Sequence, residues 1–566
     1  MLTTSLSRGA CVALFVYAGA LAGCGDDDAP PVTADAGVDA GDDAGTDAGP
    51  PRDWPLMEVP ESTITEPGVR REIFRVAGAT PPPNPTTMEA TPAELNFTQV
   101  VRYRSDVEPA ADPAAIVVAM PGTWGGAASW EPLARALVKR GVAAGRPTEV
   151  WAIDRRANLL EDLRGADAAE AAGNPDIAQG YYFLRETVGG QAFPGFRRQG
   201  DVGFMSEWGL AVHVEDVHRV IATIPAAERK TRVFLAGHSA GASFAETYAG
   251  WRFEDGSRGA DELAGLVLVD GAAFGGAAIT EDQYVNGVPG GVIPQPGVDN
   301  IRSTSRFAEI PFLGVAIYAR FEVLALRVLA APTEVVADDG RDGVLRFLFS
   351  SGARRVPPLT NRAALGFGFD ASSNPLVIAR MSIGAPTGGP LESYMNPFGT
   401  DTIVRPADST STYDWVDGPD TMPAERVRMA DFAHATSDGR TNFAEWYYPT
   451  RLPMDQAAIV GNAVAEDGYQ ARAGLRAFDG PLDDAPVLAI AAALVSPAAY
   501  DAVRARVAPM IGPGRPAAGA LRSDPRAFSV VDVTTMTHID PVQAADVAEN
   551  PVPAAIDAFV AANAAP

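Results

Sequence analysis

The fold is decided by one stretch of the chain, Arg232-Val233-Phe234-Leu235-Ala236-Gly237-His238-Ser239-Ala240-Gly241. Its apolar first half predicts a buried strand, and the Ala-rich segment that follows predicts a helix. A strand-to-helix turn this tight has no room for side chains two residues before and after its apex, so glycine is needed there. Gly237 and Gly241 meet that need. The sequence therefore predicts a turn that projects the Ser239 hydroxyl beyond the end of a strand.

Strand patterns alternate with helix patterns on both sides of this turn. We expect strands at 97–104 (half-exposed), 115–120, 149–153, 263–269, 486–494 and from 528, and helices near 129–140, 207–224 and 240–250. This alternation is typical of a mostly parallel sheet with helices on both faces, an α/β fold.

The interval between about residues 271 and 480 interrupts this pattern. It is too long for a loop of a compact domain. It contains two apolar, helix-like stretches, Phe312–Val328 and Val344–Phe349. Because the strand pattern resumes afterwards, we interpret the interval as a large, mainly helical cap domain inserted after the strand that ends at Asp270.

Over roughly residues 90–275 and 480–566 the chain resembles the α/β-hydrolase superfamily. The resemblance rests on the Ser239 pentapeptide and on the stretches Trp151–Arg156, Trp208–Leu210, Leu266–Gly271 and His538–Pro541. These stretches look like a group of large-capped bacterial hydrolases that have no assigned substrate. The resemblance implies a hydrolase core at 54–275 and 480–566, separated by the cap at 276–479.

In this superfamily the nucleophilic serine is followed along the chain by an acid and then by a histidine. Of the five histidines only His434 and His538 follow Ser239. His538 comes after the last strand and before a C-terminal helix, where the catalytic histidine should lie. Asp270 ends a strand and is the expected acid, with Asp501 as the alternative. His434 belongs to the cap, and His238 is expected to pack beside the turn.

The predicted reaction is hydrolysis of a carboxylic ester through an acyl-enzyme, with His538 as the base. Pro121-Gly122-Thr123 stands where the superfamily usually has His-Gly-x. The backbone N–H groups of Thr123 and Ala240 are therefore expected to form the oxyanion hole. The alternatives are amide or thioester hydrolysis or acyl transfer by the same residues, and a non-catalytic surface lipoprotein that keeps the fold for binding.

The first 53 residues predict export and anchoring. An apolar run at 12–22 is too short to span a bilayer but suits a signal peptide, and Leu21-Ala22-Gly23-Cys24 resembles the lipobox of bacterial lipoproteins. The resemblance implies that residues 1–23 are removed and Cys24 is acylated, which anchors the protein in a bacterial cell envelope. The Asp-, Ala- and Gly-rich segment 24–53 predicts a disordered acidic linker.

Composition excludes several kinds of partner and chemistry. The formal net charge of −26 argues against nucleic-acid binding, which needs clustered Lys and Arg. Because both cysteines lie within the first 24 residues, the folded part has none for disulfides, cysteine-ligated zinc or a thiol nucleophile. We expect neither a metal nor an organic cofactor. The apolar stretches of the cap favour a small, hydrophobic ester as the substrate.

Overall fold

The computed structural model describes residues 62–107, 112–272, 278–288, 295–309, 313–336, 356–419, 425–437, 440–459, 467–476, 485–507 and 528–564, together with the isolated positions 60, 422 and 464. The predicted signal peptide, Cys24, the acidic linker and the stretch Val344–Phe349 lie outside these residues. Among the described helices, none is both long enough and apolar enough to cross a membrane.

A nine-stranded sheet organises the described residues, in the order β1-β2-β3-β5-β4-β8-β9-β16-β17. The six strands from β5 to β17 run parallel, and β1, β2 and β3 extend one edge in antiparallel pairing. Their bounds are β1 Ser62–Glu66, β2 Val69–Ala77, β3 Phe97–Arg104, β4 Ala115–Met120, β5 Thr148–Asp154, β8 Val233–His238, β9 Gly265–Val269, β16 Val487–Ala491 and β17 Phe528–Asp532.

Both faces of the sheet are buried, which explains why its central strands read as continuous apolar runs. Successive side chains of β4 alternate between two hydrophobic clusters: Ile116 belongs to one and Val117 to the other. The first cluster includes residues of α4 (Leu210–Ala222) and α6 (Ala240–Gly250), and the second includes residues of α1 (Glu131–Ala143) and α17 (Val552–Asn563). The helices thus cover the two faces in pairs.

The cap follows β9 and combines helices with small sheets. Among the described residues its α-helices are α7 Glu281–Asn286, α8 Val298–Ser303, α9 Ala316–Ala330, α11 Asn361–Phe369, α12 Met429–Ser437, α13 Arg451–Ala458 and α14 Tyr469–Arg472. Three antiparallel strand pairs accompany them, namely β10 Gly287–Val288 with β11 Gln295–Pro296, β12 Gly384–Thr387 with β15 Asp414–Asp417, and β13 Leu391–Met395 with β14 Thr402–Pro406.

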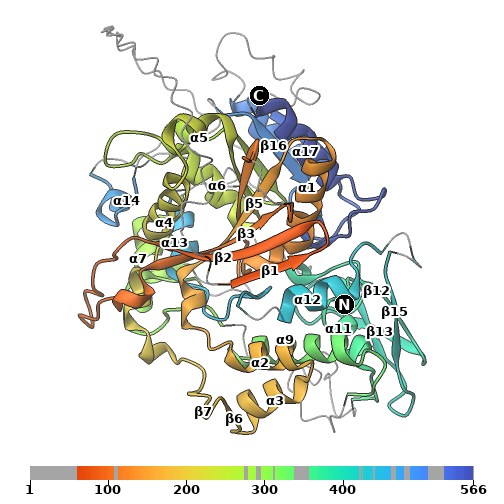
Figure 1. The fold of residues 1–566 in the computed structure, drawn as a ribbon. Coiled ribbons are helices and arrows are strands. Elements are labelled where there is room, and N and C mark those ends of the chain that lie inside the picture. The colour runs from red at the N-terminus through yellow and green to blue at the C-terminus, as the bar shows by residue number, and fades with distance from the viewer. Residues whose placement is uncertain are drawn as a thin grey trace, which may run out of the picture.

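A second excursion, between β5 and α4, packs against the cap. It contains α2 (Arg164–Ala172), α3 (Pro175–Phe183) and a small pair of strands, β6 (Thr187–Val188) with β7 (Gln191–Ala192). Both α2 and α3 contact α9, and in Figure 1 these helices lie together below the sheet, whereas α13 lies beside α4. Two chain segments, the cap and this excursion, therefore form the part of the structure beyond the strand ends.

The remaining helices complete the core, with α5 at Ala226–Arg232, α15 at Pro497–Val507 and α16 at Asp540–Gln543. The core elements expected from the sequence are present with small shifts of their ends. One expectation was wrong in detail: the strand at 97–104 is almost wholly buried, because β2 and β5 flank it and helices cover it. The strands β1 and β2 and the excursion after β5 were not expected.

Candidate active site

Ser239 lies at the apex of a strained turn between β8 and α6. Its backbone has φ 56° and ψ −124°, values that a non-glycine residue rarely adopts. A Cβ on Gly237 would clash with the Gly241 carbonyl oxygen, and a Cβ on Gly241 would clash with that of Met120. The turn therefore requires both glycines. Ser239 itself is only 6% exposed.

The first residue of α6 and the loop after β4 meet at this turn. Ala240 begins α6, so its N–H has no partner within the helix. A Cβ on Gly122 would lie 2.9 Å from the Cβ of Ser239, which brings the loop that carries Thr123 into contact with the turn. Thr123 and Ala240, the two expected oxyanion donors, thus flank Ser239 from different elements.

His538 and Asp270 lie close together, although one follows the cap in the sequence and the other precedes it. Nδ1 of His538, in the loop after β17, lies 2.7 Å from Oδ2 of Asp270, which directly follows β9. Both side chains are buried. Asp501, the alternative acid, lies on α15. The structure therefore pairs His538 with the acid expected from the strand before the cap.

Backbone donors from the loop after β16 surround the Asp270 carboxylate. The N–H groups of Ala492, Leu494 and Val495 donate to it over 2.8–3.1 Å. Burial alone would raise the pKa of Asp270, but the hydrogen bonds from His538 and from this loop outweigh burial and lower the pKa. The loop after β16 therefore stabilises the charged form of Asp270, the carboxylate that directly follows β9.

Three other histidines do not take part in the Asp270–His538 pair. Nε2 of His238 donates to the His538 carbonyl oxygen at 2.8 Å, and the two rings lie 4.5 Å apart. Burial, with the nearby His538, lowers the pKa of His238 to about 3, so it is neutral and helps to hold the histidine loop. His213 is buried in α4 against Gly209, and His218 pairs with Glu262.

Arg155 and the cap both hold the loop after β4 in place. The Arg155 guanidinium donates to the carbonyl oxygens of Pro121, Gly122 and Gly125 at 2.5, 3.1 and 3.0 Å. It also forms a fully buried ion pair with Glu445 of the cap at 2.9 Å. Burial raises the pKa of Glu445 to about 7 although Arg155 acts against it.

The cap segment 442–446 also binds this loop through its backbone. The N–H of Glu445 donates to the Trp124 carbonyl oxygen at 2.8 Å, and the N–H of Gly126 donates to that of Phe443 at 2.9 Å. A Cβ on Gly126 would clash with the Asn442 carbonyl oxygen. The cap and the loop are therefore paired like two short antiparallel strands.

The cap also holds the histidine loop. The carboxylate of Asp540 accepts hydrogen bonds from the Ser382 backbone and hydroxyl at 2.8 and 2.7 Å, and from the Thr537 N–H at 2.9 Å. Sequence reasoning missed Arg155, Glu445 and Asp540 as positioning residues. Two arginines directly after a buried strand were the available signal for the first, since a buried guanidinium needs several partners.

The strand order, the crossovers and the Ser239 turn together decide the architecture. The chain has the α/β-hydrolase fold. No protein-family model and no curated protein sequence matches it.

Solved structures resemble the chain only distantly. They include a thermophilic esterase from Thermogutta terrifontis (12% identity, TM-score 0.31, covering 87% of this chain and 100% of that one) and an α/β-hydrolase fold protein from Nakamurella multipartita (12%, 0.30, 87% and 99%). A soluble variant of monoglyceride lipase from Saccharomyces cerevisiae gives 9% identity and a TM-score of 0.28 over 91% of this chain and 100% of that one. At these values the likeness carries no inference about activity.

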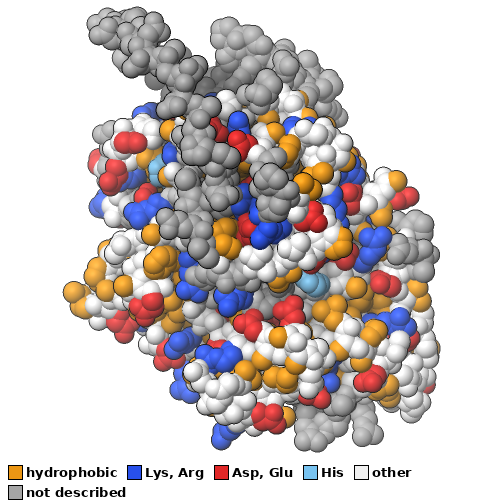
Figure 2. All heavy atoms as spheres, viewed as in Figure 1, with side chains coloured by type: hydrophobic (Ala, Val, Ile, Leu, Met, Phe, Trp, Pro, Cys, Tyr) orange, Lys and Arg blue, Asp and Glu red, His pale blue; other side chains and the backbone are white. Residues whose placement is uncertain are grey.

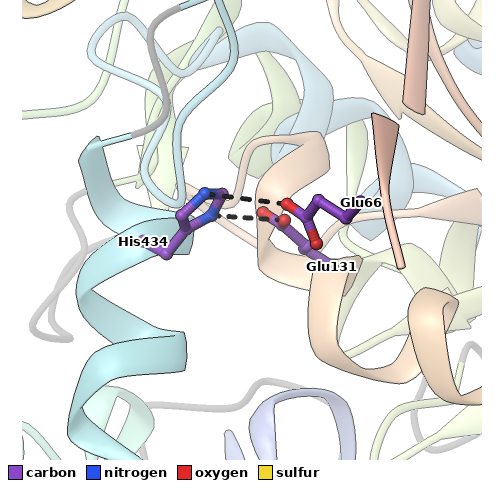
Figure 3. Close-up of side chains that lie close together, drawn as sticks. All are labelled: Glu66, Glu131 and His434. Carbon is purple, nitrogen blue, oxygen red and sulfur yellow. Dashed lines mark ion pairs between the residues drawn. The ribbon is translucent and has the colours of Figure 1, made fainter. Parts of the chain in front are cut away.

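A cluster of ionisable side chains joins the cap to the core away from Ser239 (Figure 3). Nδ1 of His434, on α12, lies 3.3 Å from Oε1 of Glu131, and its Nε2 lies 4.0 Å from Oε1 of Glu66. The three residues have the donor atoms of a metal site. Arg135, however, already forms ion pairs with both carboxylates, so a cation is in place. We therefore interpret the cluster as an ion-pair network. Figure 2 shows acidic and basic side chains interspersed over the face of the molecule that it draws.

This network should make the stability of the protein depend on pH. The hydrogen bond that His434 donates to Glu131, together with the Glu131 charge, raises the pKa of His434. Burial would raise the pKa of Glu131, but His434 and Arg135 outweigh it and lower the pKa to about 2. The His434 contribution is thus complete below its unfolded pKa of about 6.5 and is lost as pH rises through the raised folded value.

We expect the wild-type protein to have a higher Tm than the His434→Gln variant at pH 6, and the difference to shrink as the pH is raised towards 9. Thermal unfolding followed by circular dichroism at several pH values measures this. A difference in Tm that stays constant over the whole range would contradict a charged link between α12 and the core.

Proposed function

We propose that the protein is a serine hydrolase that cleaves carboxylic esters through an acyl-enzyme. The observation that supports this most directly is the hydrogen bond between Asp270 and Nδ1 of His538 beside the strained turn that carries Ser239. With Nδ1 engaged by the carboxylate, Nε2 is the ring nitrogen that serves the serine. A binding protein would have no need of this arrangement.

The reaction follows from these positions. Nε2 of His538 takes the proton from Ser239 as Oγ bonds to the ester carbonyl carbon, and the N–H groups of Thr123 and Ala240 stabilise the oxyanion. When the tetrahedral intermediate collapses, the bond to the alcohol oxygen breaks and the His538 imidazolium returns its proton to that oxygen. Water then attacks the acyl-enzyme by the same route and releases the acid.

Asp270 keeps the imidazole in the required tautomer and stabilises it when it is charged. The lowered pKa of Asp270 means that the acid is ionised at neutral pH. The helix N-terminus at Ala240 adds a favourable dipole at the developing oxyanion. Each step is thus supplied by groups of this chain.

Labelling with a fluorophosphonate probe tests this proposal. We expect the wild-type protein to be labelled and Ser239→Ala to be unlabelled, because the probe reacts only with an activated serine. Ser243→Ala, one turn further along α6, is the matched control and should be labelled like the wild type. A wild-type protein that is folded by circular dichroism but takes no label would refute the proposal.

A further inference from the structure

Three glutamates from three parts of the chain meet beside the loop after β4. Glu161 belongs to the excursion after β5, Glu322 to α9 and Glu445 to the cap segment 442–446. The side-chain amide of Asn442 donates to Oε2 of Glu161 at 2.7 Å and to Oε1 of Glu322 at 2.9 Å. Trp446 joins the same two carboxyls, with its backbone N–H on Glu161 at 2.7 Å and its indole N–H on Glu322 at 2.8 Å.

Several polar atoms of this cluster have no hydrogen-bond partner among the described residues. They are Oε2 of Glu322, Oε1 of Glu445, Oδ1 of Asn442 and the hydroxyl of Tyr318. All four side chains belong to residues that are at most 5% exposed. Buried polar atoms in folded proteins are almost always hydrogen-bonded, so this set calls for a partner that the described chain does not supply. When Glu322 and Glu445 are ionised, three of the four atoms are acceptors only, and a partner for them should then donate.

The cluster is next to the candidate active site. A Cβ on Gly126 would lie 3.1 Å from Oδ1 of Asn442, so this unpartnered oxygen faces the loop after β4. The Glu445 N–H binds the same loop at Trp124. Thr123 and Glu161 are only half-buried, so the region is not sealed from solvent. These contacts place the cluster against the loop that carries Thr123, the expected oxyanion donor.

The cluster also lacks positive charge. Glu445 pairs with Arg155, but no Lys or Arg of the described part of the chain forms an ion pair with Glu161 or Glu322. Burial raises the pKa of Glu322 to about 8 and that of Glu161 well above its ordinary range. Trp446 and Tyr318 add aromatic rings, whose faces attract cations.

We propose that this cluster binds a protonated amine carried by the substrate, so that the preferred ester has an ammonium group. The inference rests on the proposed function and adds a substrate class to it. An ammonium group offers three donors and no acceptor, which complements the unpartnered oxygens. A metal ion fits less well, because the Asn442 NH₂ group lies between the two carboxyls and is not a ligand.

This inference changes the expectation of a hydrophobic substrate. That expectation relied on the apolar stretches Phe312–Val328 and Val344–Phe349. The described part of the first forms most of α9, and the second lies outside the described residues. Within α9, Tyr318 and Glu322 are one turn apart and both are buried on the side that meets the cluster. These two buried polar side chains of α9 thus lie where they bear on specificity.

Two esters of equal shape test the proposal in catalysis. We expect kcat/KM to be at least about tenfold higher for p-nitrophenyl 6-aminohexanoate than for p-nitrophenyl heptanoate, in which a methyl group replaces the ammonium, since a buried charge contact is worth at least that factor. Glu322→Gln should abolish the preference, so that the ratio of the two kcat/KM values falls to about one. Glu281→Gln, which alters an exposed carboxylate on α7 of the cap, should keep the preference. Equal rates for the two esters would overturn the proposal.

A binding measurement keeps this test separate from that of the hydrolase itself. Calorimetry with Ser239→Ala should show binding of hexylammonium and none of hexanol at the same concentration. If fluorophosphonate labelling fails but hexylammonium binds, the proposed reaction is wrong and the amine site stands. If neither ligand binds, or both bind alike, the cluster holds water only. Glu161→Gln repeats the test should Glu322→Gln fail to fold.

Discussion

Asp270→Asn should lower kcat by about four orders of magnitude while the protein stays folded. Oδ1 of Asp270 accepts the N–H groups of Ala492 and Val495, whereas Oδ2 faces His538. Asparagine would keep its oxygen towards the backbone donors and turn its NH₂ group towards the imidazole. Nδ1 of His538 would then have to accept, and the proton would move to Nε2. In that tautomer His538 cannot take the proton from Ser239.

The control for this variant is Asp501→Asn, which should leave kcat unchanged within a factor of about two, since substitutions away from a buried network have small effects. Initial rates with any ester that the wild type hydrolyses give kcat for both variants. Thermal unfolding checks that Asp270→Asn is folded. A large loss in Asp501→Asn with normal turnover in Asp270→Asn would move the acid to α15.

Arg155→Met is expected to lower kcat about 10²–10³-fold and to change KM much less. This is the loss that follows removal of one oxyanion donor. The guanidinium binds three carbonyl oxygens of the loop that presents the Thr123 N–H, and no other described side chain donates to these three oxygens. Without it the donor should no longer be held in place for the transition state, although the ground-state ester would still bind.

Steady-state kinetics with a p-nitrophenyl ester separates this positioning role from a general loss of structure. Arg155→Lys should recover part of kcat, because an ammonium group can reach some of the three oxygens. Arg156→Lys is the matched control, since the neighbouring guanidinium binds Asp216 and Ala79 instead of the loop. If Arg155→Met and Arg156→Lys lower kcat equally, Arg155 has only a structural role.

The central sheet could be predicted because its signals are local. The apolar run of β4, the glycines around Ser239 and the carboxylate after β9 each follow from a few neighbouring residues. The pairing of His538 with Asp270 could be expected from their places relative to the strands. These are features for which the order of residues along the chain directly limits the geometry.

The contacts that complete the site could not be predicted in this way. Arg155 and Glu445 are 290 residues apart, and no periodicity links a guanidinium after β5 to one acid of the cap. The excursion that carries Glu161 has short helices with small residues, so its pattern is weak. The expectation of a hydrophobic substrate considered only the apolar residues of the cap. It therefore missed Glu322, whose importance depends on the residues that bury it.

The pairing of the cap segment 442–446 with the loop after β4 sets the order in which the protein can become active during synthesis. The nucleophile, the acid and the oxyanion loop all leave the ribosome within the first 270 residues. A chain of that length still lacks Glu445, which pairs with Arg155, and His538. The proposed hydrolytic activity can thus arise only after His538 has been synthesised and segment 442–446 has bound the loop. Two proteolytic cuts that released segment 442–446 should in turn abolish the proposed activity without removing Ser239, Asp270 or His538.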